Sequence, residues 1–269
     1  MELNQKEFEL LREYIKSNYG INMGDEKKTL VYSRLRSLLK KLNFDDFASY
    51  YQYLINDKSG EAAAVFINKI TTNHTFFMRE SEHFEYLTQT VLPWVEKKFA
   101  NTKDLRLWCA ACSSGEEAYT LQMVVQEYFT TKSGWNLEIL ATDISEKVLQ
   151  QASVGIYSKD SVQTLPKEWY NKYFKVYDED NVIVSDSLKK HITFRKFNLM
   201  QQSMPFKKPM QVIFCRNVMI YFDATTREAL VNRLYSIIES DGYFFIGHSE
   251  SLSNINTKFN YIKPAIYKK

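Results

Sequence analysis

The chain has 269 residues, of which 45% are hydrophobic and 15% aromatic, so it can bury a substantial core. Its formal net charge of only +3 argues against nucleic acid as a partner, and its three cysteines exclude a disulfide framework. It begins without a basic-then-apolar leader and contains no run approaching ~18 apolar residues. We therefore expect a cytoplasmic protein that does not insert into membranes.

The first part of the chain, to about Ile70, is predicted to be helical. One helix ends at Gly20, which suits a C-cap, and a second runs from about Asp25 to Leu42. Between Lys27 and Lys41 this second helix carries six basic residues and no acidic one. Such a surface is either simply solvated or a docking surface for an acidic partner, and the pattern alone leaves both readings open.

The next stretch, TTNHTFFMRESEHFEYLTQTVLPWV, places a polar turn before an aromatic run and predicts a helix that stops near Pro93. Arg79 lies within this run, and an arginine that becomes buried needs an anionic partner. That partner could be Glu82 or Glu85, or a bound anion.

The segment Leu105–Thr120, LRLWCAACSSGEEAYT, predicts a strand, a tight turn and the start of a helix at Glu116. Gly115 in this turn either serves geometry alone or allows the backbone to approach a ligand closely. Cys109 and Cys112 form a C-x-x-C without a second pair or a nearby histidine, so we interpret them as buried small residues rather than as a metal or redox site.

A second strand, LEILATDI, ends in Asp143. An acid at this position holds the ribose diol in nucleotide-binding α/β sheets, which predicts an adenosine-containing cofactor. Asn198, Arg216 and Asn217 also follow predicted strands, so they should meet Asp143 at the carboxyl edge of one sheet. The turn ACSSGEE lacks the three-glycine dinucleotide pattern, which argues against a nicotinamide dehydrogenase.

In the second half of the chain, KVY, NVIVSDSL and HITFRKFNL are short β-rich pieces that predict a small antiparallel excursion of two or three strands. MQVIFC is predicted to be a buried strand, followed by an amphipathic helix from Asp223 to Glu239. FNYIKPAIYKK is predicted to be a last edge strand containing Pro264. The alternation of strands and helices predicts a doubly wound, mainly parallel sheet.

The motifs TTNHTFFMRESEHF, AACSSGEEAYT, LATDISEKVL and FCRNVMIYFD, with GHSESL downstream, resemble the CheR family of chemotaxis-receptor methyltransferases over nearly the whole chain. The resemblance implies an α/β fold with a Rossmann-like S-adenosylmethionine-dependent methyltransferase sheet. It also implies an all-helical N-terminal domain over residues 1–72, a methyltransferase domain over 73–269 and an inserted antiparallel β-subdomain at about 175–193. The implied reaction methylates receptor glutamate side chains and leaves S-adenosylhomocysteine.

The resemblance further implies roles for individual residues. Cofactor contacts are expected from residues within and between these motifs: Asn73, Thr75, Arg79, Glu117, Asp143, Asn198, Leu199, Arg216 and Asn217. Arg79 is expected close to the methionine part of the cofactor and the reaction centre, and Tyr221 near the transferred methyl group. Docking to the receptor is expected from the basic helix: Arg34, Arg36, Lys40 and Lys41. No metal is expected.

The expected partner is the cytoplasmic helical bundle of chemotaxis receptors. Family members that grip a C-terminal receptor pentapeptide carry a glycine-containing loop, but Lys175–Thr193 contains no glycine, so we expect no such tether. We also expect a monomer. The alternative is a non-catalytic module that senses S-adenosylmethionine and binds a receptor or regulator. It should have a damaged cofactor pocket, and the motifs show no damage.

Overall fold

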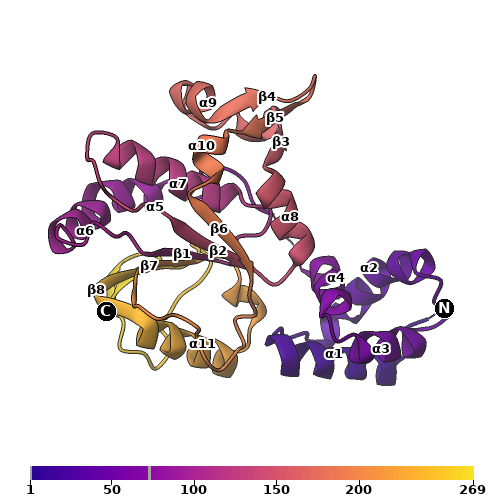
Figure 1. Ribbon diagram of the computed structural model, residues 1–269. Helices are drawn as coiled ribbons and strands as arrows, with labels where there is room; N and C mark the ends of the chain where they lie inside the picture. The colour runs from indigo at the N-terminus through magenta and orange to yellow at the C-terminus, as the bar shows by residue number, and fades with distance from the viewer. Residues whose placement is uncertain (1, 72–73) are drawn as a thin grey trace.

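The structure, a computed structural model, describes residues 2–71 and 74–269. Figure 1 shows a helical N-terminal domain beside a large sheet with helices on both faces, and a small sheet beyond it. The N-terminal domain contains α1 (Gln5–Tyr19), η1 (Asp25–Lys27), α2 (Lys28–Lys41), α3 (Phe47–Asn56) and α4 (Glu61–Ile70). Helix α1 starts at a capping box between Asn4 and Glu7 and ends, as predicted, at Gly20 in the left-handed conformation.

In the described part of the chain the large sheet has seven strands in the order β6-β2-β1-β7-β8-β10-β9. The first five strands pair in parallel, and β10 pairs antiparallel with both β8 and β9, which confirms the prediction of a mainly parallel sheet. The strands are β1 (Leu107–Ala110), β2 (Ile139–Asp143), β6 (Ile192–Lys196), β7 (Met210–Cys215), β8 (Ile238–Phe245), β9 (Asn260–Lys263) and β10 (Ile266–Lys268). Strand β1 is buried along its whole length because both faces are covered.

Alternate residues of each strand enter two separate hydrophobic cores. Leu107 and Cys109 of β1 pack on one face, and Trp108 and Ala110 pack on the other, in the core that also includes the N-terminal domain. The first face is covered by α5 (Glu82–Tyr86), η2 (Leu87–Val91), α6 (Leu92–Lys98) and α7 (Glu116–Phe129). Helix α11 (Ala224–Ile237) covers the opposite face. Two further helices of this domain are α8 (Glu146–Val154) and η4 (Met219–Tyr221).

Two predicted ends differ in the structure. The helix expected to stop near Pro93 continues to Lys98, because Pro93 falls in the first turn of α6, where no hydrogen bond from its nitrogen is required. The single edge strand around Pro264 is two strands, since the chain reverses at Ala265 with φ 62° between β9 and β10. None of the helices in the described ranges is both long and apolar enough to span a bilayer.

The small antiparallel sheet has the order β3-β5-β4. It contains β3 (Ile156–Ser158), η3 (Asp160–Val162), α9 (Lys167–Tyr173), β4 (Phe174–Val176), β5 (Asn181–Val184) and the short helix α10 (Asp186–Lys189). The excursion was placed at about 175–193, and its third strand was expected in HITFRKFNL. KVY and NVIVSDSL contribute to β4 and β5, which pair antiparallel as predicted. The assignment of HITFRKFNL was wrong: Ile192–Lys196 is β6 and pairs in parallel with β2, and the third strand of the small sheet is Ile156–Ser158. Local β propensity cannot distinguish which sheet a strand joins.

Candidate active site

A cavity of about 280 Å³ opens at the carboxyl ends of β1, β2 and β7, where parallel sheets bind ligands. Part of its wall comes from the N-terminal domain: Tyr19, Ile21, Ile67, Asn68 and Thr71. Hydrogen bonds fix this domain to the sheet, with Asn68 Nδ2 donating to Ser145 Oγ at 2.7 Å and Asn198 Nδ2 donating to the Asn18 carbonyl at 2.9 Å. The helical domain therefore closes the cavity, which the sequence did not indicate.

The turn after β1 holds Ala111 and Ser113 in the left-handed conformation, at φ 63° and 49°. The Asp143 carboxylate secures this turn by accepting hydrogen bonds from the Ser113 nitrogen at 2.9 Å and the Ser145 nitrogen at 3.0 Å. Burial raises the pKa of Asp143 above its ordinary value, although these backbone donors act in the opposite direction. The carboxylate oxygens have further lone pairs with which to accept bonds from a diol in the cavity.

Gly115 serves the packing of the fold. Its φ is 99°, and a Cβ placed there would lie 2.7 Å from the Cβ of Ala152 in α8. The cavity wall near this turn comes instead from Cys112 and Ser113. Of the two readings that the sequence left open, the geometric one is therefore correct.

Arg216 lies between two carboxylates. Its Nη1 donates to Glu117 Oε2 at 2.6 Å and its Nη2 lies 3.0 Å from Glu80 Oε2, with the side chain fully buried. Burial alone would raise the pKa of Glu80, but Arg216 outweighs it and holds that pKa below the ordinary value. This ion-pair cluster joins the segment before α5 to the end of β7. The sequence indicated Arg216 and Glu117 as cofactor contacts and missed Glu80.

Arg79 lines the cavity, with its side chain 28% exposed. It donates to the His74 carbonyl at 2.5 Å, and its Nε lies 3.9 Å from Glu80 Oε1. The carboxylate beside it is thus Glu80, and neither Glu82 nor Glu85 takes the role suggested for it. At 3.9 Å this pair is loose, so the guanidinium can also reach an anion in the cavity.

The loop after β7 carries Asn217 and Tyr221 into the cavity wall, and Glu250 holds it in place. The buried Glu250 carboxylate accepts hydrogen bonds from the nitrogens of Asn217 at 2.9 Å, Gly247 at 2.6 Å and Ile220 at 3.2 Å. Asn217 has φ 58°, so the loop is sharply bent. Glu250 was not predicted as a site residue, although it is the acid of the GHSE motif.

The side chains predicted to contact the cofactor or reaction centre come together at one place. The cavity is lined by Thr75, Arg79, Glu117, Asp143, Asn198, Leu199, Arg216, Asn217 and Tyr221. Asn73 lies outside the described residues. Sequence reasoning missed the apolar wall next to Asp143, which consists of Ile144, Val148 and Phe197, because apolar residues at strand ends give no signal distinct from core.

The predicted docking residues lie away from this cavity, on α2. Arg36, Lys40 and Lys41 are exposed, but Arg34 is only partly so. Its Nη1 donates to the carbonyls of Lys69, Ile70 and Thr71 at 3.2, 3.0 and 3.1 Å. Arg34 therefore satisfies the C-terminal carbonyls of α4, as cations at helix C-termini do. Its docking role stays a prediction, and the number of basic residues on α2 could not reveal that the end of α4 lies beside Arg34.

Cys109, Cys112 and Cys215 are buried as free thiols, which for Cys109 and Cys112 confirms the interpretation as buried small residues. Burial raises the pKa of each thiol well above its ordinary value, and nearby carboxylates act in the same direction. Protonated thiols of this kind are poor nucleophiles and poor metal ligands.

Comparison with known proteins assigns the class. A family model described as "CheR methyltransferase, SAM binding domain" matches residues 73–267, and one described as "CheR methyltransferase, all-alpha domain" matches residues 6–71. The chain is 43% identical to the chemotaxis protein methyltransferase of Borreliella burgdorferi, over 99% of this chain and 95% of that protein. It is 34% identical to the Escherichia coli protein of the same description, over 98% and 91%. The chain therefore belongs to the CheR methyltransferase family.

Its cofactor is S-adenosylmethionine, as predicted. The donor set of the cavity fits this molecule: an apolar wall suits adenine, the Asp143 carboxylate suits a ribose diol, and the Arg79 guanidinium suits a carboxylate. When bound, S-adenosylmethionine supplies a methyl group on a sulfonium sulfur, activated for displacement by a nucleophile. The residues of the chain then have to bind and orient the cofactor and the nucleophile and to exclude water.

Proposed function

We propose that this methyltransferase esterifies glutamate side chains in the cytoplasmic helical bundle of chemotaxis receptors, forming glutamate methyl esters. The observation that carries the proposal is the convergence of nine predicted site residues on one cavity, in a chain 43% identical to a chemotaxis protein methyltransferase. The exposed basic face of α2, on the domain that closes this cavity, suits a helical partner rich in glutamate.

The chemistry that this substrate needs matches what the cavity offers. A glutamate with a pKa of about 4.3 is already ionised near pH 7, so no side chain has to remove a proton. The enzyme has to hold a carboxylate oxygen roughly 3 to 3.5 Å from the methyl carbon and in line with the departing sulfur. Opposite charges are neutralised as this bond forms, so a strong fixed charge beside the reacting oxygen would favour the reactants. We assign Tyr221 a hydrogen bond that orients the substrate carboxylate, and Arg79 a pairing role with the cofactor's carboxylate.

The reaction is tested by incubating the protein with methyl-labelled S-adenosylmethionine and receptor-rich membranes, then treating the labelled product with base. A carboxyl methyl ester releases its label as methanol, whereas methylated amines and nucleic acids retain theirs. Label that stays bound after base treatment would contradict glutamate esterification. Cofactor binding without any transfer to receptors would support the alternative, a non-catalytic cofactor-sensing module.

Replacing Arg79 by alanine should weaken S-adenosylmethionine binding by about 10- to 100-fold and slow turnover, since a hydrogen bond to a charged group contributes about 1.5–3 kcal/mol. Isothermal titration calorimetry measures the affinity. Arg195→Ala, at an exposed position of β6, is the matched control and should bind like the parent protein. Unchanged affinity in Arg79→Ala would reject the assigned role.

The basic face of α2 predicts a different behaviour. Lys40→Glu combined with Lys41→Glu should lower receptor methylation several-fold at low salt and reduce its salt dependence, without changing cofactor affinity, because both side chains are exposed. Charge reversal at exposed Lys207 and Lys258 is the control for net charge. Normal receptor methylation by the Lys40 and Lys41 variant would contradict the docking assignment.

Arg34→Ala should instead lower cofactor affinity, because Arg34 holds the carbonyl of Thr71 in the cavity wall.

The absence of a pentapeptide tether remains our prediction. The loop between β4 and β5 in the small sheet is short and contains no glycine, spanning residues 177–180. A receptor whose last five residues are deleted should therefore be methylated at the same rate as the intact receptor. A large loss of rate on deletion would show that the tether operates here.

A further inference from the structure

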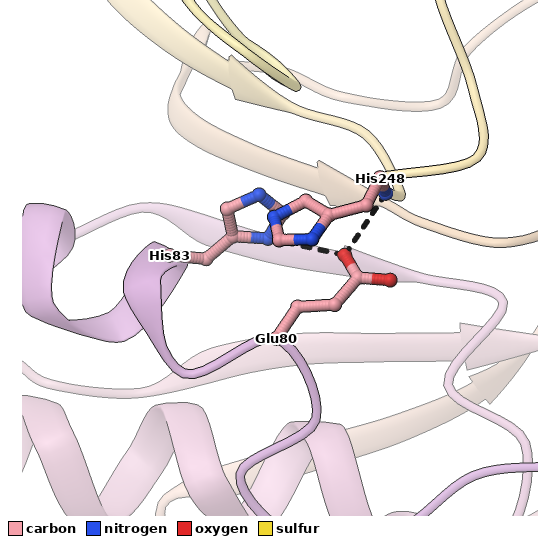
Figure 2. Close-up of side chains that lie close together, drawn as sticks. All are labelled: Glu80, His83 and His248. Atoms are coloured by element: carbon pink, nitrogen blue, oxygen red, sulfur yellow. Dashed lines mark hydrogen bonds and ion pairs between the residues drawn. The ribbon is translucent and has the colours of Figure 1, made fainter.

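Glu80, His83 and His248 form a cluster on the outer side of the Arg216 ion-pair cluster. Glu80 precedes α5, His83 lies within it, and His248 follows β8. Figure 2 shows the two imidazole rings beside the Glu80 carboxylate, with His248 coming from the segment after β8. The ring centroids are 4.7 Å apart, and one potential ligand atom from each residue lies within 4.8 Å of the other two.

His83 is an unexplained buried polar group. The residue is 1% exposed, yet neither of its ring nitrogens has a hydrogen-bond partner within the described residues. Its Nδ1 lies 3.6 Å from Glu80 Oε2, which is too long for a hydrogen bond. A buried donor or acceptor left without a partner costs about 1–3 kcal/mol, so a group absent from the polypeptide is the natural partner.

We propose that Glu80, His83 and His248 bind one divalent transition-metal ion, with Zn²⁺ the best fit, and that the bound ion weakens cofactor binding. Two imidazole nitrogens and one carboxylate oxygen are a typical zinc donor set. Bond lengths of about 2.0–2.2 Å place tetrahedral ligand atoms roughly 3.4 Å apart, so the present spacing has to contract by about 1.4 Å at most. His248 is exposed, so its side chain can rotate to close that distance and the ion can enter from solvent.

The charged groups around this cluster determine how an ion bound there would affect its neighbours. Glu80 Oε2 already accepts a hydrogen bond from the backbone nitrogen of His248 at 3.1 Å and pairs with Arg216 Nη2 at 3.0 Å. A cation at this oxygen therefore competes with Arg216, which retains Glu117 and the Arg79 carbonyl as partners. Glu80 and Glu117 supply two negative charges, against the buried Arg216 guanidinium and the partly exposed Arg79, whose Nε lies 3.9 Å from Glu80 Oε1. The ion therefore has to compete with both arginines for the Glu80 carboxylate.

Competition for Glu80 reaches the cavity directly. Glu80 Oε1 accepts from Asn217 Nδ2 at 3.3 Å, and Arg79, Arg216 and Asn217 all line the cavity. When the Glu80 carboxylate moves toward the ion, its interactions with Arg79, Arg216 and Asn217 weaken. Binding of the ion and of S-adenosylmethionine should therefore oppose each other by the same factor in both directions. This coupling is independent of which group the enzyme methylates.

The test titrates chelator-treated full-length protein with Zn²⁺, using competition with a chromophoric chelator, and with Co²⁺, whose visible absorption reports tetrahedral ligation. One ion should bind per chain, His248→Ala and His83→Gln should each weaken binding at least tenfold, and the control His191→Ala should bind like the parent. Saturating Zn²⁺ should reduce S-adenosylmethionine affinity several-fold in the parent and in His191→Ala but not in His248→Ala. The last comparison also corrects for zinc chelated by the cofactor in solution. No histidine-dependent binding, or a parent cofactor affinity indifferent to Zn²⁺, would overturn the proposal.

Discussion

Replacing Arg216 by alanine is expected to abolish detectable S-adenosylmethionine binding and to lower the free energy of unfolding by about 3–5 kcal/mol. The guanidinium is fully buried between Glu80 and Glu117, so its removal leaves two carboxylates in a low-dielectric interior without their counter-ion. Most of the decrease in the free energy of unfolding comes from leaving these two carboxylates buried and unpaired, and less from losing the attraction to Arg216. Urea unfolding monitored by circular dichroism gives the stability, and calorimetry gives the affinity.

The chain provides a matched control in Arg106. It also bridges two carboxylates, Asp104 and Glu239, each at 3.2 Å, but its side chain is 17% exposed. Arg106 precedes β1 and so lies at the amino end of that strand, whereas the cavity lies at the carboxyl end. Arg106→Ala should therefore destabilise less and leave cofactor affinity unchanged. Arg216→Lys distinguishes charge from geometry, since lysine keeps the charge but cannot reach both carboxylates in the same way. Equal losses of cofactor affinity in Arg106→Ala and Arg216→Ala would show that global destabilisation, not the site, is responsible.

Replacing Glu250 by alanine is expected to reduce turnover on the order of 100-fold, because small misplacements of positioned groups have effects of that size. Glu250 does not line the cavity. It acts through the backbone nitrogens of Asn217, Gly247 and Ile220, each of which would lose its acceptor. An unpartnered buried donor costs about 1–3 kcal/mol, so the loop that carries Asn217 and Tyr221 should relax.

Glu250→Gln separates these effects. Its carbonyl oxygen can still accept hydrogen bonds, so turnover should recover partly, while Ser251→Ala, at the next and exposed position, should behave as the parent. Steady-state kinetics should show a lower kcat with a smaller change in the KM for S-adenosylmethionine, since Asp143 and the apolar wall remain in place. Parent-like turnover in a folded Glu250→Ala protein would contradict a positioning role for this residue.

Several features of the fold could be predicted because they depend on neighbours in sequence. The helix end at Gly20 needs only a residue that tolerates positive φ, and Asp143 is the last residue of the predicted strand. The carboxyl edge of a parallel sheet also brings together residues that are distant in sequence. Asp143 and Asn217, which are 74 positions apart, line the same cavity. Topology alone therefore gave the position of the candidate site.

Other features depend on partners that are distant in sequence. The six basic residues between Lys27 and Lys41 predicted a basic surface but could not show that Arg34 reaches the end of α4. Likewise the β propensity of Ile192–Lys196 predicted a strand but not the choice between the small sheet and the edge beside β2. Glu80 and Glu250 were missed because an acid in a polar stretch has the same local pattern whether it is solvated or buried.

By itself, the sequence determined the family, the cofactor class and nine of the residues that line the cavity, because motifs and strand ends depend on neighbouring residues in the sequence. Only the tertiary structure decided which of those residues face the cavity and which support it. Arg216, Glu80 and Glu117 form a buried cluster, and Glu250 shapes a loop. The physical reason is that burial and pairing, which set the energy of a charge, arise from segments that meet only when the chain has folded.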